Sequence, residues 1–307
     1  MLQFISRRIL ISVVVLWGVA TLVFLMMHLL PGDPVEVMLS RSGGSAEVVA
    51  SLREQLGLDD PLHVQYLRFF SNAMRGELGR SIYSGMKVSD LIASQLPATL
   101  QLALGGLLVA VVLGMGLGLV AALNHNSWLD NLCVTLSVLG VSMPIFWLGL
   151  LLIFVFAVTL GWLPATGEGS LKHLILPCLV LGFVSAGSIA RLFRASMLDV
   201  LRREYMTTAS AKGLRKTVVI TRHALRNALI PVITMIGMQF AFLLGGTVVT
   251  ETVFARRGMG QLIINAIIWK DFPVVQGAVL VTAVAYMGVN LLVDLSYGFF
   301  DPRIRFD

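Results

Sequence analysis

The chain has 307 residues, of which 57% are apolar and only 13% are charged. Soluble domains carry about 45–50% apolar and about 25% charged residues, so an ordinary soluble globular protein is excluded, and so is a disordered chain. The two cysteines, Cys133 and Cys178, lie in apolar stretches, where we interpret them as small hydrophobic residues and not as a disulfide or metal ligands.

Six stretches are long and apolar enough to cross a bilayer, which takes about 20 helical residues. The polar cluster Asn124–Asn131 separates the second stretch from the third. The expected crossings are residues 9–30, 98–123, 133–160, 174–190 with a possible extension to 193, 228–250, and 272–293 with a continuation to 299. We therefore predict an all-α membrane protein with six transmembrane helices.

The distribution of Lys and Arg predicts the orientation of these helices. The side that holds both termini and the loop 194–227 carries 13 Lys and Arg against 5 Asp and Glu, whereas the other side, which includes residues 31–97, carries 10 against 11. The positive-inside rule then places the N-terminal residues 1–8, the loop 194–227 and the C-terminus in the cytoplasm. The basic pI of about 9.7 follows from this topology. Since no basic stripe is interleaved with aromatic residues, we expect a lipid bilayer and no nucleic acid as partner.

The outward segment 31–97 is predicted to form three short helices. The first covers Ser45–Leu56, and the second starts at Asp60-Pro61 and ends at Gly76. The third covers Val88–Leu96 and runs into Pro97. Two compatible interpretations stay open, namely a small cap on the membrane helices and a docking surface for an external partner.

The inward loop 194–227 contains a short apolar helix face made of Tyr205, Met206 and Ala209, followed by a predicted helix stop at Gly213. A short helix held between two membrane helices is suited to insertion into a partner's groove. An amphipathic helix resting on lipid headgroups is the alternative. The residues alone do not decide between the two.

Motifs of catalysis are absent from the sequence. It contains no Gly-x-x-x-x-Gly-Lys-Ser/Thr, His-Glu-x-x-His, Cys-x-x-Cys or Gly-x-Ser-x-Gly pattern, and its five histidines are scattered. We predict no catalytic residue, no metal ligand and no cofactor in this chain, which is not an enzyme. Asp294 shares a predicted helix face with Asn290, where it could mark a pathway or pair with a loop arginine.

Motifs along nearly the whole chain resemble those of permease subunits of binding-protein-dependent ABC importers, in the dipeptide/oligopeptide/nickel group. They are Leu30-Pro31-Gly32-Asp33-Pro34, residues 55–62, Ser142-Met143-Pro144, Trp162-Leu163-Pro164, residues 191–199, residues 209–213, residues 223–231, Leu244-Gly245-Gly246, Glu251, Val253-Phe254, Gly258-Met259-Gly260 and Asp301-Pro302-Arg303.

The resemblance implies a type I ABC importer permease fold in the bacterial inner (cytoplasmic) membrane, with a small helical extracytoplasmic insertion after the first helix and a core of five helices over residues 98–307. It also implies four kinds of partner: a second homologous permease, two cytoplasmic ABC ATPase subunits that bind ATP and Mg, an extracytoplasmic substrate-binding protein and the bilayer. Dipeptides or oligopeptides are the expected substrates. Nickel, a nickel chelate and glutathione are the alternatives within the family.

The resemblance also implies sites. The loop that couples to the ATPase comprises Glu204, Tyr205, Met206, Thr207, Thr208, Ala209, Gly213, Arg222, His223 and Asn227. Thr207-Thr208 stand where the general coupling motif has Glu-Ala, and Glu204 could replace the missing carboxylate. Candidate residues of the translocation path and subunit interface are Met238, Phe242, Gly245 and Gly246. Candidate contacts for the binding protein are Asp59, Asp60, Glu251 and Arg256.

Outside this family, a stand-alone ion-coupled carrier is the main rival interpretation. Such a carrier would be expected to show inverted repeats and ionisable residues at the membrane midplane. We find no repeat, and Asp294 is the only acid within a predicted span. An intramembrane enzyme is a weaker rival because its catalytic residues are missing.

Overall fold

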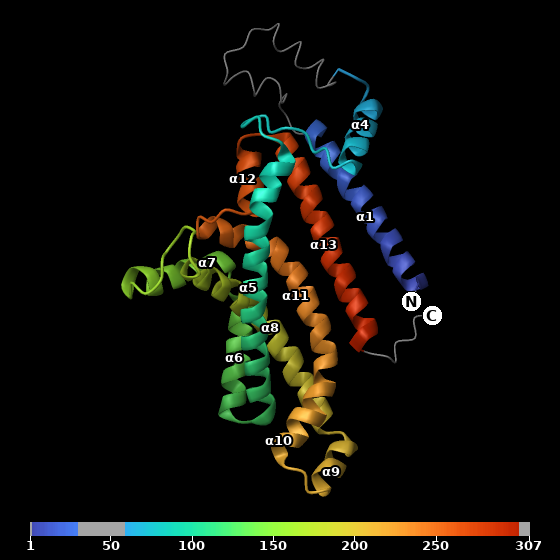
Figure 1. Ribbon diagram of the computed structural model, residues 1–307. Coiled ribbons are helices and arrows are strands. Elements are labelled where there is room, and N and C mark those ends of the chain that lie inside the picture. The colour runs from blue at the N-terminus through green and yellow to red at the C-terminus, as the bar shows by residue number, and fades with distance from the viewer. Residues whose placement is uncertain (1, 30–58, 301–307) are drawn as a thin grey trace. The chain divides into compact units, whose positions relative to one another are not determined.

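The structure is a computed structural model that describes residues 2–29 and 59–300 (Figure 1). Within these ranges the regular elements are all helices, and one isolated bridge joins Arg80 and Lys87. The helices are α1 (Leu2–Leu29), α4 (Leu62–Met74), α5 (Val88–Leu123), α6 (Trp128–Ser142), α7 (Ile145–Leu152), η1 (Ile153–Thr159), α8 (Lys172–Leu201), α9 (Glu204–Ala211), α10 (Lys216–Val218), η2 (Val219–Ala224), α11 (Leu225–Val253), α12 (Met259–Ile268) and α13 (Phe272–Phe300). The elements η1 and η2 are π-helices.

The predicted crossings correspond to five spans that are long and apolar enough to cross a membrane, and to a sixth if one bent helix pair counts as a single span. The five spans are Ser6–Met26, Val88–Leu123, Lys172–Leu201, Lys216–Val253 and Phe272–Val293. The span that was expected at 174–190 therefore extends further at its C-terminal end, to Leu201, and the one expected at 228–250 starts earlier, at Lys216.

The expected third crossing at 133–160 is not one straight helix. The helix α6 ends at Ser142, and the segment Ile145–Thr159 continues at an angle of 109° to it, so that α7 turns away from α6 (Figure 1). The cause is Pro144, which cannot continue the helix and restricts the residue before it to extended conformations. Met143 accordingly has a ψ of 130°, and α7 starts anew after Pro144.

The prediction of a separate helix ending at Pro97 is wrong, because Val88–Leu123 forms one continuous helix with Pro97 inside it. A proline inside a helix removes one backbone hydrogen bond, and membrane helices tolerate this where neighbouring groups satisfy the freed carbonyl. The predicted helix after Asp60-Pro61 is confirmed as α4. The predicted helix Ser45–Leu56 and the side chain of Asp294 lie outside the described residues.

The chain divides into two compact units. One comprises residues 1–98 with 257–288, and the other comprises residues 99–256 with 289–307. In the first unit the core joins the start of α5 to α12 and the start of α13, through Val88, Ile92, Met259, Ala266 and Val274. The ring of Phe24 from α1 also contacts Tyr66 and Phe69 of α4.

In the second unit, α8 is the central helix and packs against α5, α6 and α11. Glycines make the approach of α5 possible: a Cβ built on Gly114 would lie 2.8 Å from Ile189 Cβ, and one on Gly118 would lie 2.7 Å from the Ala190 carbonyl oxygen. Small residues allow membrane helices to pack this closely. These glycines therefore serve packing within the chain. Both cysteines are free and buried in this unit, as predicted.

Candidate functional site

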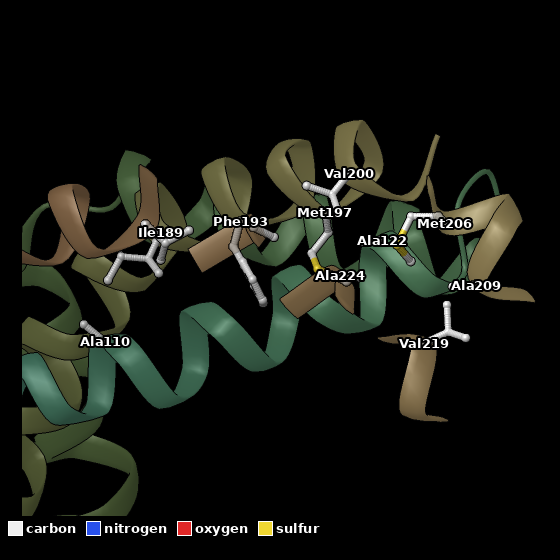
Figure 2. Packing of buried hydrophobic residues seen from close by; sticks show 12 residues of the cluster. Ala110, Ala122, Ile189, Phe193, Met197, Val200, Met206, Ala209, Val219 and Ala224 are labelled. Carbon is white, nitrogen blue, oxygen red and sulfur yellow. The ribbon is translucent and has the colours of Figure 1, made fainter. Parts of the chain in front are cut away.

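The loop that was predicted to couple to an ATPase folds as a short helix, α9, between the end of α8 and the π-helix η2. The side chains of Met206 and Ala209 point into a core that α5, α8, η2 and α11 supply (Figure 2). Their exposed fractions are 4% and 8%. In the same core lie Ala110, Ala122, Ile189, Phe193, Met197, Val200, Val219, Ala224, Ala228 and Val232.

This packing corrects the expectation that the apolar face of α9 is offered to a partner. Met206 and Ala209 anchor the helix to its own chain, since a short amphipathic helix buries its apolar side against the nearest core. The opposite side of α9 is exposed and presents Glu204, Tyr205 and the pair Thr207-Thr208.

A hydrogen bond joins the two ends of the loop. The side-chain nitrogen Nδ2 of Asn227 on α11 donates to the hydroxyl of Tyr205 on α9 over 3.0 Å, and it also donates to the carbonyl of His223 over 3.0 Å. Three residues of the predicted coupling set are thus brought together. Arg222 is exposed on η2, next to the half-buried His223.

Gly213 ends α9 with a φ of +73°, as the sequence predicted, and its N–H donates to the Ser210 carbonyl over 3.0 Å. This left-handed conformation is one that glycine adopts without cost. A Cβ built on Gly213 would meet nothing within 4 Å. The chain itself therefore leaves open space beside this position.

The residues predicted for the translocation path lie on α11. Met238 is 58% exposed and Phe242 is 54% exposed. Together with Gly245 they occupy positions spaced four and three residues apart, which places them on one helix face. Gly246 is half-buried beside this face, and a Cβ on it would lie 3.9 Å from the Phe242 ring. Three of the four predicted residues thus share an open face, and the fourth flanks it.

The four predicted contacts for a binding protein are split by their burial. Asp59 is exposed, and Asp60 is half-buried and forms an ion pair of 2.6 Å with Arg68. Glu251 and Arg256 are instead buried, with exposed fractions of 0% and 4%. Neither of these two offers a surface to a partner, so the expectation for them is not supported.

The interactions of Glu251 and Arg256 explain this burial. The hydroxyl of Thr99 on α5 donates to Glu251 Oε1 over 2.6 Å. Arg256 Nη1 donates to the carbonyl groups of Gly167 and His173 over 3.5 and 3.4 Å. The two residues therefore connect α11 with α5 and with the loop that precedes α8. Both had been expected as binding-protein contacts from the family resemblance.

The sequence did not predict one ionic cluster, which forms around Asp130. Arg194 of α8 binds the buried carboxylate of Asp130 in α6 with two charge-assisted hydrogen bonds of 2.6 Å, from Nε and Nη2. The Asn126 N–H donates to the same carboxylate over 3.0 Å, and His125 Nδ1 lies 3.3 Å from it. The cluster fixes the turn between α5 and α6 onto α8. The polar cluster 124–131 was visible in the sequence, but its partner lies 64 residues further on.

A second polar cluster lies at the junction of α12 and α13. The carboxylate of Asp271, 3% exposed, accepts a hydrogen bond of 2.5 Å from the Ser81 hydroxyl. It also accepts the backbone N–H groups of Ile82 and Tyr83 over 3.1 and 3.2 Å. Asp271 thereby fastens the turn 81–84, nearly 190 residues away in sequence, to the start of α13. Among the described residues, no group of three or more His, Cys, Asp or Glu side chains could hold a metal ion.

The chain consists mainly of apolar helices long enough to span a membrane. Two of them, α8 and α11, are joined through the segment that contains the short helix α9. This is the organisation of a membrane transport subunit. Comparison with family models identifies it further. Residues 114–306 match the inner membrane component of binding-protein-dependent transport systems, and residues 1–103 match the N-terminal part of the membrane component of such systems. The chain therefore belongs to this family. It is a multi-pass inner-membrane permease subunit of an ABC importer and not an enzyme.

Relatives and solved structures agree with this assignment. The chain is 45% identical over 306 residues to the glutathione transport system permease protein GsiC of Escherichia coli (strain K12) and of Salmonella typhimurium, with both chains covered completely. The fold is similar to that of the inward-facing MetNI methionine ABC transporter, with a TM-score of 0.60 and 16% identity over 69% of this chain and 96% of that chain. An amino acid ABC transporter solved with histidines gives a TM-score of 0.55 and 14% identity over 69% of this chain and 94% of that one. The fold is thus the type I ABC importer permease fold.

Proposed function

We propose that this chain is the permease subunit of an ATP-driven importer of short peptides, with the tripeptide glutathione as the first candidate substrate. The observation that carries this proposal is the 45% identity to glutathione permeases over 306 residues, which covers 100% of both chains. The dipeptides or oligopeptides that the sequence analysis favoured belong to the same chemical class. Glutathione was among its alternatives.

In this proposal the exposed side of α9 binds a cytoplasmic ATPase. Glu204, Tyr205 and Thr207-Thr208 form the contact, while Met206 and Ala209 hold α9 against α8 and α11. A movement of the ATPase then reaches both membrane helices through α9. Two ATPase subunits bind ATP and Mg, and this chain binds neither.

The open face of α11 lines the path and faces a second, homologous permease. Met238, Phe242 and Gly245 supply this face. Both chain termini and α9 lie on the cytoplasmic side, as the distribution of cations predicts. A substrate-binding protein delivers the peptide on the opposite side, where Asp59 and Asp60 are candidate contacts.

The proposal is tested by uptake into proteoliposomes that contain the complete transport complex and its binding protein. We expect ATP-dependent accumulation of radiolabelled glutathione, and none when this chain is omitted. Dipeptides and a nickel salt serve as competitors in the same assay. ATP-dependent uptake of nickel with no uptake of any peptide would refute the proposed substrate class.

A further inference from the structure

In the first unit, a pair of stacked aromatic rings lies beside a buried carboxylate that accepts hydrogen bonds from the same segments. The rings of Tyr83 and Trp269 stack with their centroids 4.1 Å apart and an interplanar angle of 20°. Asp271, two residues after Trp269, accepts the N–H of Tyr83 and the hydroxyl of Ser81. Both aromatic residues are thereby positioned by one hydrogen-bonded junction of the first unit.

The stacked rings are exposed although they are rigidly held. Tyr83 is 55% exposed and Trp269 is 37% exposed. Other apolar side chains of the same two segments are also exposed, namely Met86, Ile267 and Ile268. We call residues 80–87 with 267–270 the aromatic platform. Preorganised Tyr and Trp side chains are the residue types that carry most of the binding energy in protein interfaces.

The charge of the aromatic platform is positive. Arg80, Lys87 and Lys270 are exposed, and the platform contains no acidic residue. The exposed acids Glu77 and Asp90 flank it, so that the exposed side chains leave an excess of one positive charge, while the carboxylate of Asp271 beneath the platform is buried. A complementary partner surface has an apolar centre and an acidic rim.

The surroundings of the platform favour water over lipid. Directly after it, α5 starts with the exposed polar residues Ser89, Asp90 and Ser94. With 36 residues, α5 is about 54 Å long, and the hydrocarbon core of a bilayer is only about 30 Å thick. The first turns of α5 therefore extend beyond the hydrocarbon, and the platform precedes them.

We propose that the aromatic platform is a docking surface for the extracytoplasmic substrate-binding protein, which contacts it with an apolar patch surrounded by carboxylates. The inference rests on the proposed function, in which such a protein delivers the substrate. Two observations support this partner: transport in this family depends on a binding protein, and a water-soluble partner suits a cationic aromatic surface outside the hydrocarbon.

The test measures binding of the system's own binding protein to the complete complex in nanodiscs. We expect Tyr83→Ala and Trp269→Ala each to raise the Kd at least tenfold, while basal ATP hydrolysis stays unchanged. The matched control is Trp128→Ala, which removes a 71% exposed tryptophan from α6. We expect this control to leave the Kd unchanged.

Charge reversal tests the predicted acidic rim. Lys87→Glu combined with Lys270→Glu is expected to weaken binding and to reduce its dependence on salt. Arg75→Glu reverses an exposed cation outside the platform and is the control. If both alanine variants bind within twofold of wild type, the docking surface is refuted.

Two further outcomes separate this inference from its alternatives. Fluorescence quenching by bromolipids that disappears in Trp269→Phe would place the platform in the membrane and overturn the inference. If the wild-type complex imports no peptide but still binds its binding protein, the proposed substrate class fails, and the Kd of the alanine variants still decides the docking surface. A wild-type complex that binds no such protein would refute both.

Discussion

Gly213 offers the sharpest test of the coupling role of α9, because the chain itself leaves space for a side chain there. Alanine at a φ of +73° costs about 1–2 kcal/mol of strain, which changes a conformational equilibrium by a factor of roughly 5–30. Asparagine tolerates the left-handed conformation better than alanine does. A Cβ at this position meets no atom of the chain within 4 Å. Any loss of activity that exceeds the cost of backbone strain must therefore come from contact with a partner.

The assay is ATP hydrolysis stimulated by the loaded binding protein, measured on the reconstituted complex. If an ATPase packs closely against Gly213, we expect both Gly213→Ala and Gly213→Asn to lose most of the stimulation, with asparagine no better than alanine. Assembly should be unchanged because no membrane helix is altered, and co-purification of the ATPase checks this. If Gly213→Asn retains wild-type stimulation of ATP hydrolysis, the close contact with the ATPase is refuted. If only Gly213→Ala loses stimulation, the glycine is needed for its backbone conformation and not for a contact.

Three further predictions concern topology, assembly and stability. A cysteine replacing Ser45 should be labelled from outside by a membrane-impermeant reagent and one replacing Ser210 should not, in a chain whose native cysteines are replaced; the reverse pattern would invert the topology. A photocrosslinker at Phe242 should reach a second permease chain, and crosslinks to lipid alone would remove the open face of α11 from the interface. Asp130→Asn should destabilise the protein by about 2–3 kcal/mol. This is less than the roughly 3–5 kcal/mol lost when a fully buried ion pair is broken, because the Arg194 side chain is 25% exposed. An unchanged melting temperature in detergent would contradict this.

The membrane helices could be predicted because each depends on a long run of local composition. Whether a proline within such a run ends the helix was harder to predict. Pro97 and Pro144 look alike in sequence, yet α5 continues through Pro97, whereas the chain bends by 109° at Pro144. The difference depends on what satisfies the freed backbone groups and on which helices pack nearby, and neither is encoded next to the proline.

Polar partners distant in sequence could not be predicted at all. Asp130 with Arg194 and Ser81 with Asp271 meet only because the helices that carry them pack together. The helix α9 is an intermediate case. Its boundaries and the conformation of Gly213 followed from local signals, whereas the periodicity of Met206 and Ala209 identified an apolar face without saying what covers it.

The core that covers the apolar face of α9 bears on how a movement of α9 would pass through the second unit. The core around Met206 and Ala209 continues along α8 through Met197 and Phe193 to Ile189. From Val200 to Ile189 this is about 16 Å along the helix. Close-packed interiors transmit displacement because they contain few voids to absorb it.

The same core includes Ala228 and Val232 of α11, whose open face lies one to three turns further along the helix at Met238 and Phe242. Because α9 is packed into this core by two buried side chains, it cannot move as a free loop. A force on its exposed residues must shift α8 and α11 together or break the packing. Variants that loosen the core, such as Met206→Ala, should therefore reduce transport more than they reduce ATP hydrolysis, and equal losses of both would indicate that α9 serves only to bind the ATPase.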